Sequence, residues 1–356
     1  METSLGAPHF APESTYLNTA SMGLLPRKAA AVLRDGIANA VAGRPTPELG
    51  FPSVDGARAA FARLVGVDPG RVATSGAVAV HVGLIAGSLP DGAEVLVADG
   101  DFSSLVNPFA VRPGLKLRSV PLDALADAVR PGTALVAVSA VQSADGRVAD
   151  LAAIREAARA HGARTLVDAT QAAGWFPLNA GDFDYTVTGS YKWLLCPRGV
   201  SFLTVPEDGG GLRPVFSGWT AGEDPWESCY GPVRRLARSA RRFDESHALL
   251  AYLAAPHALA VIEETGTEAI RAHNLALAAR CRAGLAELGY EPLPGPGSAI
   301  VAVPGLGGRA EEALTAADVH VAVRAGNLRA AFHLYNTAAD VDRLLDVLSG
   351  LPAAPA

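Results

Sequence analysis

RTLVDATQAAG at 164–174 and FDYTVTGSYKWLL at 183–195 are the two stretches that decide the fold of this chain. Each starts with apolar and β-branched residues and ends in polar ones, which is typical of a buried parallel strand followed by a loop. The first strand ends at Asp168, and the second ends shortly before Lys192. Open parallel sheets bind ligands in the crevice at the carboxyl ends of their strands, so we expect this carboxylate and this amine to meet there.

An acid and an amine delivered to one crevice predict a pyridoxal 5′-phosphate site. A lysine can hold the cofactor aldehyde as a Schiff base, and a carboxylate can keep the pyridine nitrogen protonated so that the ring withdraws electrons. Lys192 and Asp168 are therefore the candidate catalytic residues. Taken singly, each has an ordinary alternative, because an acid at a strand end and a lysine between aromatic residues often lie on a solvated surface.

Short apolar runs alternate with helical patterns along much of the chain, which is the signature of an α/β fold. Further strands are expected at 71–76, 93–100, 115–122, 133–141 and 199–206. The segment 150–162 predicts a crossover helix that ends at Gly162. Beyond a break at 206–214, the Trp- and Arg-rich stretch up to Phe243 predicts a long functional loop. Mostly helical sequence then follows from His247, before short strands and a last helix at 341–350.

Composition is that of an ordinary cytoplasmic enzyme. The 356 residues are 49% apolar and long enough for two domains. The net charge of -6, with no basic run, predicts neither nucleic acid nor an anionic membrane as a partner. The N-terminus lacks a secretion pattern, and no apolar run is long enough to span a bilayer. The three cysteines, Cys196, Cys229 and Cys281, lack metal-ligand spacing, so we interpret them as reduced and structural and expect no metal site.

Seven segments, in chain order, resemble the landmarks of the class V aminotransferase-like enzymes of pyridoxal phosphate fold type I. They are YLNTASMGLLP, TSGAVAVHVGL, GDFSSLVNPF, VQSADGRVADL, VDATQAAG, GSYKWLLCPRGVSFL and RAAFHLYNT. The resemblance implies a large domain at 20–246, with a mostly parallel seven-stranded sheet sandwiched by helices. It also implies a smaller α+β domain formed by 247–356 together with an N-terminal arm, 1–19.

The same resemblance implies the cofactor contacts. Besides Asp168 and Lys192, they fall on Ser75, Gly76, Ala77, Phe102, Gln142, Gln171, Ser190, Tyr191 and Thr220. The turn at 75–77 lies between a strand and a helix, whose N-terminus suits a phosphate. Relatives carry a hydroxyl where this chain has Ala77, so Ser190 and Tyr191 are expected to contribute more. Phe102 is expected to stack on the pyridine ring, and Gln171 and Gln142 to lie near its phenolic oxygen.

On the substrate side, the resemblance assigns the α-carboxylate to Arg329, whose guanidinium fork suits a planar carboxylate. Strand alternation predicts that Arg324, five residues earlier, lies on the opposite face and is structural. Asn18, Thr19 and Ser21 either line the substrate side or belong to an ordered N-terminal arm.

The resemblance fixes the cofactor better than the reaction. Cysteine desulfurases carry a nucleophilic cysteine just before the carboxylate arginine, where this chain reads RAGNLR, so desulfuration is disfavoured. We predict an enzyme that forms a Schiff base with a small or modified L-amino acid and removes its Cα proton. A C–S lyase acting by β-elimination is the first hypothesis, with an aminotransferase using a keto acid or an epimerase as alternatives. A non-catalytic relative would be expected to have lost the lysine, the aspartate or the arginine, and none is lost.

A homodimer with shared active sites is also predicted. In relatives, the loop corresponding to 214–226 reaches the phosphate of the neighbouring subunit, which would be the task of Thr220. Trp219 and Trp226 on this loop suit an interface, although an ordinary surface loop is the alternative.

Overall fold

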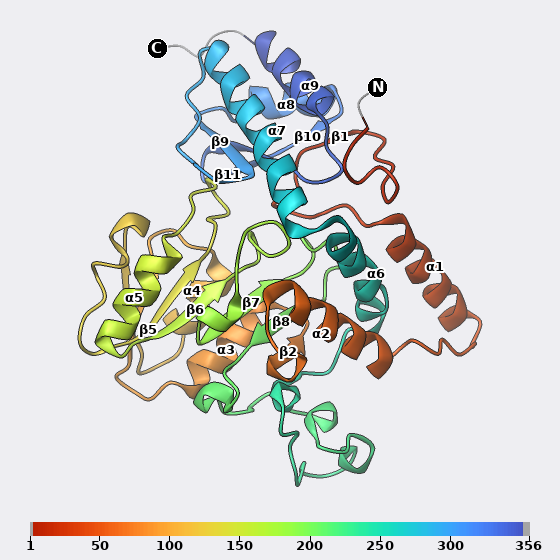
Figure 1. Ribbon diagram of the computed structural model, residues 1–356, viewed down its shortest axis with the longest axis vertical. Coiled ribbons are helices and arrows are strands. Elements are labelled where there is room, and N and C mark those ends of the chain that lie inside the picture. Colours follow the sequence, from red (N-terminus) through yellow and green to blue (C-terminus); the bar gives the residue numbers. More distant parts are fainter. Residues whose placement is uncertain (1–2, 352–356) are drawn as a thin grey trace.

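A seven-stranded sheet is at the centre of the computed structural model, which describes residues 3–351 (Figure 1). Its order is β2-β8-β7-β6-β5-β3-β4, and only β8 runs antiparallel to its neighbours. The strands are β2 (Val72–Ser75), β3 (Glu94–Ala98), β4 (Lys116–Val120), β5 (Thr133–Ser139), β6 (Arg164–Asp168), β7 (Tyr185–Gly189) and β8 (Ser201–Thr204). Each falls within a predicted segment, and the predicted α/β class with a mostly parallel seven-stranded sheet is confirmed.

Helices cover both faces of this sheet because its central strands are apolar on both sides. Val95 and Val97 of β3 pack in one core with α3 (Val78–Ser88) and α4 (Ser103–Ala110). Leu96, between them, packs with Ile154 of α5 (Leu151–His161) on the other face. As predicted, α5 ends at Gly162, whose φ of 68° is the left-handed geometry that favours glycine.

Three further helices pack beside the sheet: α1 (Arg27–Val41), α2 (Phe51–Val65) and α6 (Leu249–Thr265). α6 packs against both α1 and α2, and its Leu259 and Ile262 share one core with Phe61 of α2. The division into 20–246 and 1–19 with 247–356 stays a prediction, but α6 lies with the large-domain helices by its packing. No helix within the described residues is long and apolar enough to cross a membrane.

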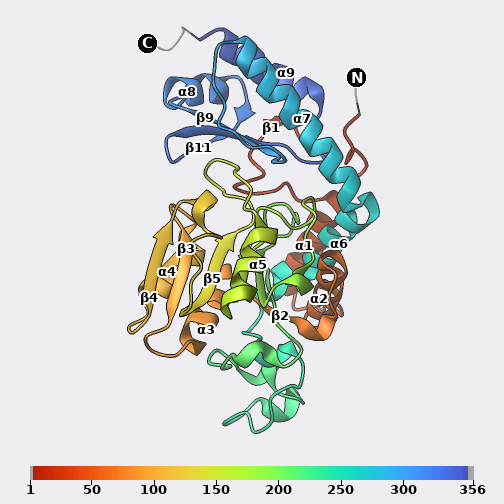
Figure 2. The same ribbon diagram turned by 60° about the vertical axis from the view of Figure 1, so that its left-hand side comes forward.

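The C-terminal part forms a smaller α+β layer above the carboxyl ends of the central strands (Figure 2). Its sheet has the order β11-β12-β9, with antiparallel pairs, and β10 pairs in parallel with the N-terminal β1. The elements are β1 (Thr15–Tyr16), α7 (Thr267–Glu287), β9 (Ile300–Pro304), α8 (Arg309–Ala316), β10 (Val319–His320), β11 (Ala322–Arg324), β12 (Asn327–Ala331) and α9 (Ala338–Ser349). Leu17 is buried in this domain's core, so the N-terminal arm is part of it.

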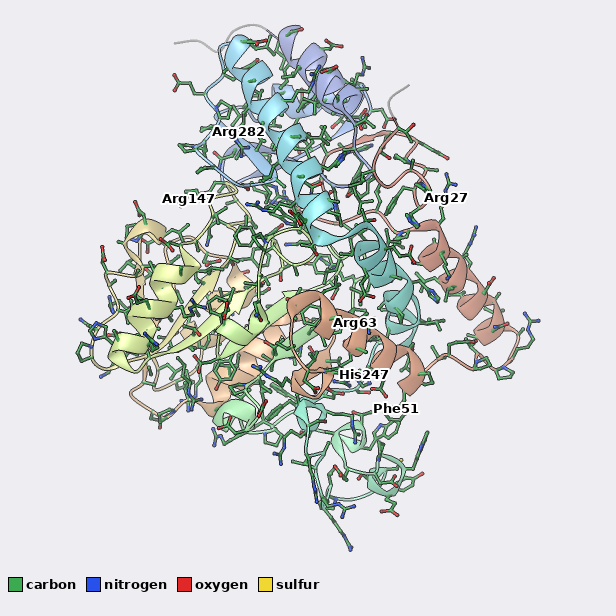
Figure 3. The ribbon with its side chains drawn as sticks, in the orientation of Figure 1. Arg27, Phe51, Arg63, Arg147, His247 and Arg282 are labelled. Atoms are coloured by element: carbon green, nitrogen blue, oxygen red, sulfur yellow. The ribbon has the colours of Figure 1, made fainter. Side chains whose placement is uncertain are left out.

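Residues 206–247 form an excursion that projects from the large domain at the end away from the C-terminal domain (Figure 1). It contains only short 3-10 turns, as the composition predicts for a long loop. Asp244 fixes its end by accepting hydrogen bonds from Arg58 Nη2 at 2.7 Å and from the Thr74 amide at 2.9 Å. His247, labelled in Figure 3 at this junction, is 2.8 Å from Thr74 Oγ1. The excursion is thereby tied to β2, whose end enters the candidate site.

Candidate active site

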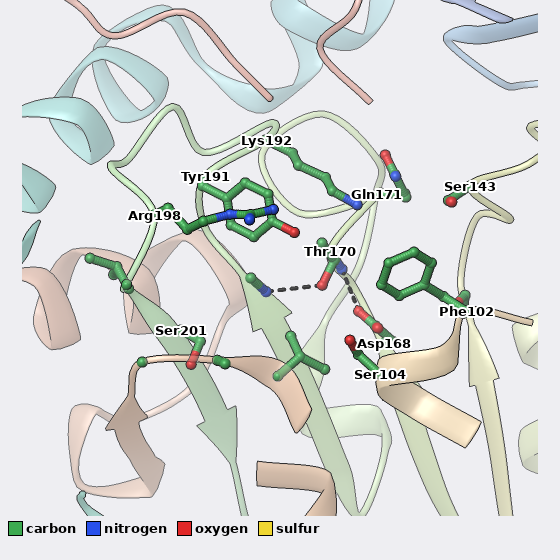
Figure 4. Close-up of a pocket in the computed structure, with 17 residues that line it drawn as sticks. Phe102, Ser104, Ser143, Asp168, Thr170, Gln171, Tyr191, Lys192, Arg198 and Ser201 are labelled. Carbon is green, nitrogen blue, oxygen red and sulfur yellow. Dashed lines mark hydrogen bonds between the residues drawn. The ribbon is translucent and has the colours of Figure 1, made fainter. Parts of the chain in front are cut away.

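A cavity of about 600 Å³ lies at the carboxyl ends of the parallel strands (Figure 4). Its walls come from the start of α3, the start of α4, the ends of β5, β6 and β7, and the loop that joins β7 to β8. This is the crevice in which open α/β sheets bind ligands. Asp168 and Lys192 both line it, so the structure brings together the two residues that the sequence singled out.

Asp168 is the last residue of β6, and only 3% of it is exposed. Its Oδ1 accepts a hydrogen bond from the Thr170 amide at 2.8 Å. Burial raises the pKa of Asp168 to about 6, against the hydrogen bonds from Thr170, which lower it. A buried carboxylate without a cationic hydrogen-bond partner suits a ligand that brings a protonated nitrogen.

Lys192 is 5% exposed and extends across the cavity, as Figure 4 shows. Burial lowers the pKa of its amine to about 8; Asp168 opposes this shift and three arginines add to it. Its backbone is held by the N-terminal segment, because the Gly23 amide donates to the Tyr191 carbonyl at 2.9 Å. An amine with this pKa has a substantial neutral fraction near neutral pH, which a Schiff-base nucleophile or a general base needs.

Phe102 presents its ring to the cavity 5.1 Å from Lys192 Nζ, measured to the ring centroid. It is 42% exposed, which leaves a flat face of the ring open to a flat ligand. The neighbouring Asp101 fixes this turn by accepting hydrogen bonds from the Phe102 amide at 2.6 Å and the Ser139 amide at 2.8 Å.

Gln171 and Gln142, both expected near the phenolic oxygen, have different surroundings. Gln171 lines the cavity, where its Nε2 donates to the Ala20 carbonyl at 2.9 Å and keeps one further N–H. Gln142 does not line it, because its Nε2 donates to Asp101 Oδ2 at 3.0 Å. Gln142 thus contacts the turn that carries Phe102, and its contact with the cofactor stays a prediction.

The phosphate end predicted at 75–77 is a helix start that opens into the cavity. Gly76, Ala77 and Val78 line the cavity, and α3 has no side-chain hydrogen bond at its N-cap. Ser75 does not line the cavity, and its Oγ lies 3.0 Å from His81 Nε2 and 2.9 Å from Ser201 Oγ.

The two residues expected to compensate for Ala77 behave differently from each other. Tyr191 lines the cavity, whereas Ser190 is fully buried behind it, with its Oγ unpartnered among the described residues. Arg198, which the sequence did not single out, lies over the Tyr191 ring at 4.6 Å and lines the same end (Figure 4). It forms no ion pair within the described part of the chain, so it is a cation available to an anionic ligand.

On the C-terminal side, Arg329 is buried at 2% exposure and donates from Nη2 to Ser21 Oγ at 2.7 Å. Its Nη1 donates to the carbonyl of Ser143, a cavity-lining residue, while its Nε has no partner in the described structure. Burial, together with the charge of Arg324, lowers the pKa of Arg329 to about 10. A buried cation with a free donor suits the α-carboxylate expected here.

The prediction that Arg324 lies on the opposite face from Arg329 is wrong. β11 and β12 form a hairpin in which Ala322 is paired with Arg329 and Arg324 with Asn327. Paired residues share a face, and so do residues two apart on one strand. The two-residue turn therefore returns Arg324 to the face of Arg329, and its Nη2 reaches within 3.5 Å of the same Ser21 Oγ.

Asn18 and Thr19 belong to the N-terminal arm and contact the C-terminal domain. Asn18 forms an isolated backbone bridge with Ala331, and its Oδ1 is buried without a partner among the described residues. Thr19 Oγ1 is hydrogen-bonded to the Tyr335 hydroxyl. Neither lines the cavity.

Thr220 is placed away from the cavity of its own chain, in a 3-10 turn (Trp219–Ala221) of the excursion. It is buried, and its Oγ1 has no hydrogen-bond partner in the described residues. A contact between this hydroxyl and a cofactor would thus have to be made in another subunit.

The cavity residues that sequence reasoning missed include Ser104, Ser143, Thr170 and Arg198. Ser104 and Thr170 each follow a predicted site residue by two positions, and Arg198 lies in CPRG just after Lys192. Proximity to a strand end was a usable signal for these, because such residues share the crevice.

These side chains fit pyridoxal phosphate. The cavity combines a buried amine, a buried carboxylate, an open aromatic face, and a helix N-terminus beside an unpaired guanidinium. These are the groups that an aldehyde, a ring nitrogen, a flat ring and a phosphate respectively require.

Comparisons with known proteins agree with this fit. The profile of the class-V aminotransferase family matches residues 52–344. The chain is 31% identical to the isopenicillin N epimerase of Amycolatopsis lactamdurans, with 96% of each chain covered. It is 29% identical to a kynureninase of Xanthomonas oryzae pv. oryzae, covering 74% of this chain and 70% of the relative. In fold, it is similar to the cystine C-S lyase C-DES, with a TM-score of 0.84 at 23% identity over 95% of this chain and 98% of that one.

Proposed function

The chain belongs to the class V aminotransferase family, and from this premise we propose that it is a lyase that eliminates a sulfur leaving group from a modified L-amino acid. It is an enzyme whose cofactor is pyridoxal 5′-phosphate. When bound, this cofactor supplies an electron sink for the bonding electrons that remain when a proton leaves Cα. The protein's own residues supply the rest of the chemistry.

The observation that carries the proposal is that the cavity offers one amine to act as the base at Cα, since Asp168 is assigned to the ring nitrogen. Among the described residues that line it, Lys192 is the sole amine, and there is no imidazole or thiol. The pKa of about 8 for this amine suits it to take the Cα proton at neutral pH. Asp168 would keep a proton on the ring nitrogen, and Arg329 would hold the α-carboxylate.

Elimination requires a base on only one face of the substrate Cα. Lys192 takes the Cα proton, the Cβ–S bond breaks, and the sulfur leaves with the bonding electron pair and accepts a proton. Hydrolysis of the remaining enamine gives a keto acid and ammonia. No cysteine is available for persulfide chemistry, because Cys196 and Cys281 are buried outside the cavity and Cys229 lies in the excursion.

An epimerase is the second candidate. It is favoured by the isopenicillin N epimerases of Amycolatopsis lactamdurans and Streptomyces clavuligerus, which are 31% and 30% identical over 96% of this chain. Epimerisation returns the proton to the opposite face of Cα, so it requires a second proton donor beyond Lys192.

One experiment separates the reactions. The holoenzyme is incubated in D2O with cysteine S-conjugates and other L-amino acids, with and without a keto acid. Pyruvate and ammonia without a keto acid support the lyase, whereas keto-acid dependence identifies an aminotransferase. Deuterium at Cα with inversion and no net consumption identifies an epimerase. Lys192→Ala should abolish the lyase, aminotransferase and epimerase activities alike. Full activity in that variant would refute the assignment of Lys192 as the base.

A homodimer with shared sites is part of the proposal. The excursion exposes large apolar side chains, including Trp226 at 72% and Tyr230 at 94%. Trp226 contacts Phe51 edge-to-face and Trp219 at a tilted angle. Such a patch is typical of an interface, and the partnerless hydroxyl of Thr220 lies beside it.

Mixing inactive variants tests this sharing. Lys192→Ala subunits are exchanged with subunits that carry Trp219→Ala and Thr220→Val. If the sites are composite, hybrids should regain part of the activity. A monomer in solution, or no recovery after confirmed subunit exchange, would contradict the proposal.

A further inference from the structure

The β11–β12 hairpin places two cations in a row above the cavity. Arg329 and Arg324 share one face of the hairpin because a two-residue turn, Ala325-Gly326, joins the strands. Both turn residues have positive φ, 48° and 79°, which is the geometry of the tightest hairpins. The relative position of the two guanidinium groups is therefore set by backbone pairing.

Both guanidinium groups are directed to one oxygen. Arg329 Nη2 lies 2.7 Å from Ser21 Oγ, and Arg324 Nη2 lies 3.5 Å from it. They differ in exposure, since Arg329 is 2% exposed and Arg324 is open to solvent. The pair thus combines a buried cation, whose Nη1 donates to the carbonyl of the cavity residue Ser143, with a solvent-exposed cation beside it.

No carboxylate balances this pair. Among the described side chains, no Asp or Glu lies within ion-pair distance of either guanidinium. The charge of Arg324 lowers the pKa of Arg329, and both arginines lower the pKa of Lys192. Two like charges this close are unfavourable without an anion between or beside them.

The charges of an ordinary amino acid substrate leave one of these cations without a partner. The phosphate end of the cavity lies by the start of α3, where Arg198 provides its own cation. The α-carboxylate is matched by the buried Arg329, which keeps a free Nε donor beside Ser143. Arg324 then faces no anion among the described residues, although its guanidinium shares Ser21 Oγ with that of Arg329.

We infer that Arg324 recognises a second carboxylate, at the end of the substrate side chain, so that the preferred substrates are amino acids with an acidic side chain. This inference rests on the proposed function, because it assumes that Arg329 holds the α-carboxylate of an amino acid. It makes Arg324 a specificity residue, while the proton transfer stays with Lys192.

The test uses two ligands that differ in this charge alone, S-carboxymethyl-L-cysteine and its amide, S-carbamoylmethyl-L-cysteine. Each is titrated into the holoenzyme, with Kd read from the cofactor absorbance and KM from initial rates. The acid should bind about tenfold or more tightly than the amide, as a charge-assisted contact predicts. Arg324→Gln should bring the ratio of the two Kd values close to one, because it weakens the binding of the acid. Arg343→Gln, a change at an exposed arginine of α9, should keep the ratio of the unmodified protein.

Three outcomes overturn the inference. The first is equal binding of acid and amide by the unmodified protein. The second is an Arg324→Gln variant that loses affinity for both ligands equally, which would assign Arg324 to the α-carboxylate. The third is an Arg324→Gln variant that still binds the acid more tightly than the amide by the same factor. L-Alanine provides a separate readout. If neither the two conjugates nor alanine changes the cofactor spectrum, the proposed function itself fails. If alanine changes the spectrum but the protein does not prefer the acid to the amide, only the inference about Arg324 fails.

Discussion

Asp168→Asn should make the cofactor-free protein more stable, and increasingly so as the pH rises. The side chain is buried at 3% exposure, and burial raises the pKa of its carboxyl group from 3.8 to about 6. Between these two values the folded protein binds more protons at this position than the unfolded chain does. The contribution of Asp168 to stability is thus most favourable below pH 3.8 and is lost as the pH rises to about 6.

The magnitude follows from the size of this shift. A difference of about 2 pKa units corresponds to about 3 kcal/mol of unfolding free energy, at roughly 1.4 kcal/mol per unit. Asparagine removes the charge and keeps an oxygen that can accept from the Thr170 amide. The unfolding free energy of the variant should therefore exceed that of the unmodified protein by about 1 kcal/mol at pH 4.5 and by about 3 kcal/mol at pH 8.

Urea unfolding of cofactor-free protein between pH 4.5 and 8 measures this difference at a fixed protein concentration. Asp35→Asn, at an exposed position of α1, is the matched control and should give a flat difference. A difference that does not grow with pH, or an Asp168→Asn variant less stable at pH 8, would refute the argument that the site holds an uncompensated charge. The expected result would mean that the fold gives up stability to keep a carboxylate ready for the cofactor.

Three other changes test separate parts of the structure. Asp244→Ala should lower the unfolding free energy by about 3–5 kcal/mol, because it leaves the Arg58 guanidinium buried without its anion. The double variant Arg58→Met with Asp244→Leu should recover most of the lost stability. A loss below about 1 kcal/mol for Asp244→Ala in urea unfolding would contradict this expectation. Arg198→Gln should raise the Kd of pyridoxal phosphate about tenfold in fluorescence titrations and leave the Kd of pyridoxal unchanged. An equal change of both Kd values would show that Arg198 does not contact the phosphate. Gly23→Ala would place a methyl carbon 2.1 Å from the Lys192 carbonyl oxygen, so thermal unfolding should reveal a loss of about 1–3 kcal/mol, and an unchanged Tm would be inconsistent with the close approach.

Strands and the two catalytic candidates could be predicted from the sequence because both depend on local patterns. A buried parallel strand must be apolar along its length, so the point where it becomes polar marks the ligand-binding edge of the sheet. Asp168 and Lys192 stand at or just beyond such points, and the structure brings them to one cavity. The helical end at Gly162 was predictable for the same reason, since a left-handed residue is a local requirement.

The partners of individual side chains could not be predicted in this way. Gln142 is bound by Asp101 across 41 positions of sequence, and Thr220 is carried away from its own cavity by the excursion. Arg324 shows the reason most clearly: counting alternation from 324 to 329 puts the two arginines on opposite faces, but the turn between the strands reverses the chain and restores them to one face. The sequence by itself determined the α/β layers and the strand ends that carry the acid and the amine. Only the tertiary structure decided which charges remain without a partner, because a side chain's partners come from segments distant in sequence, which only the packed fold brings together.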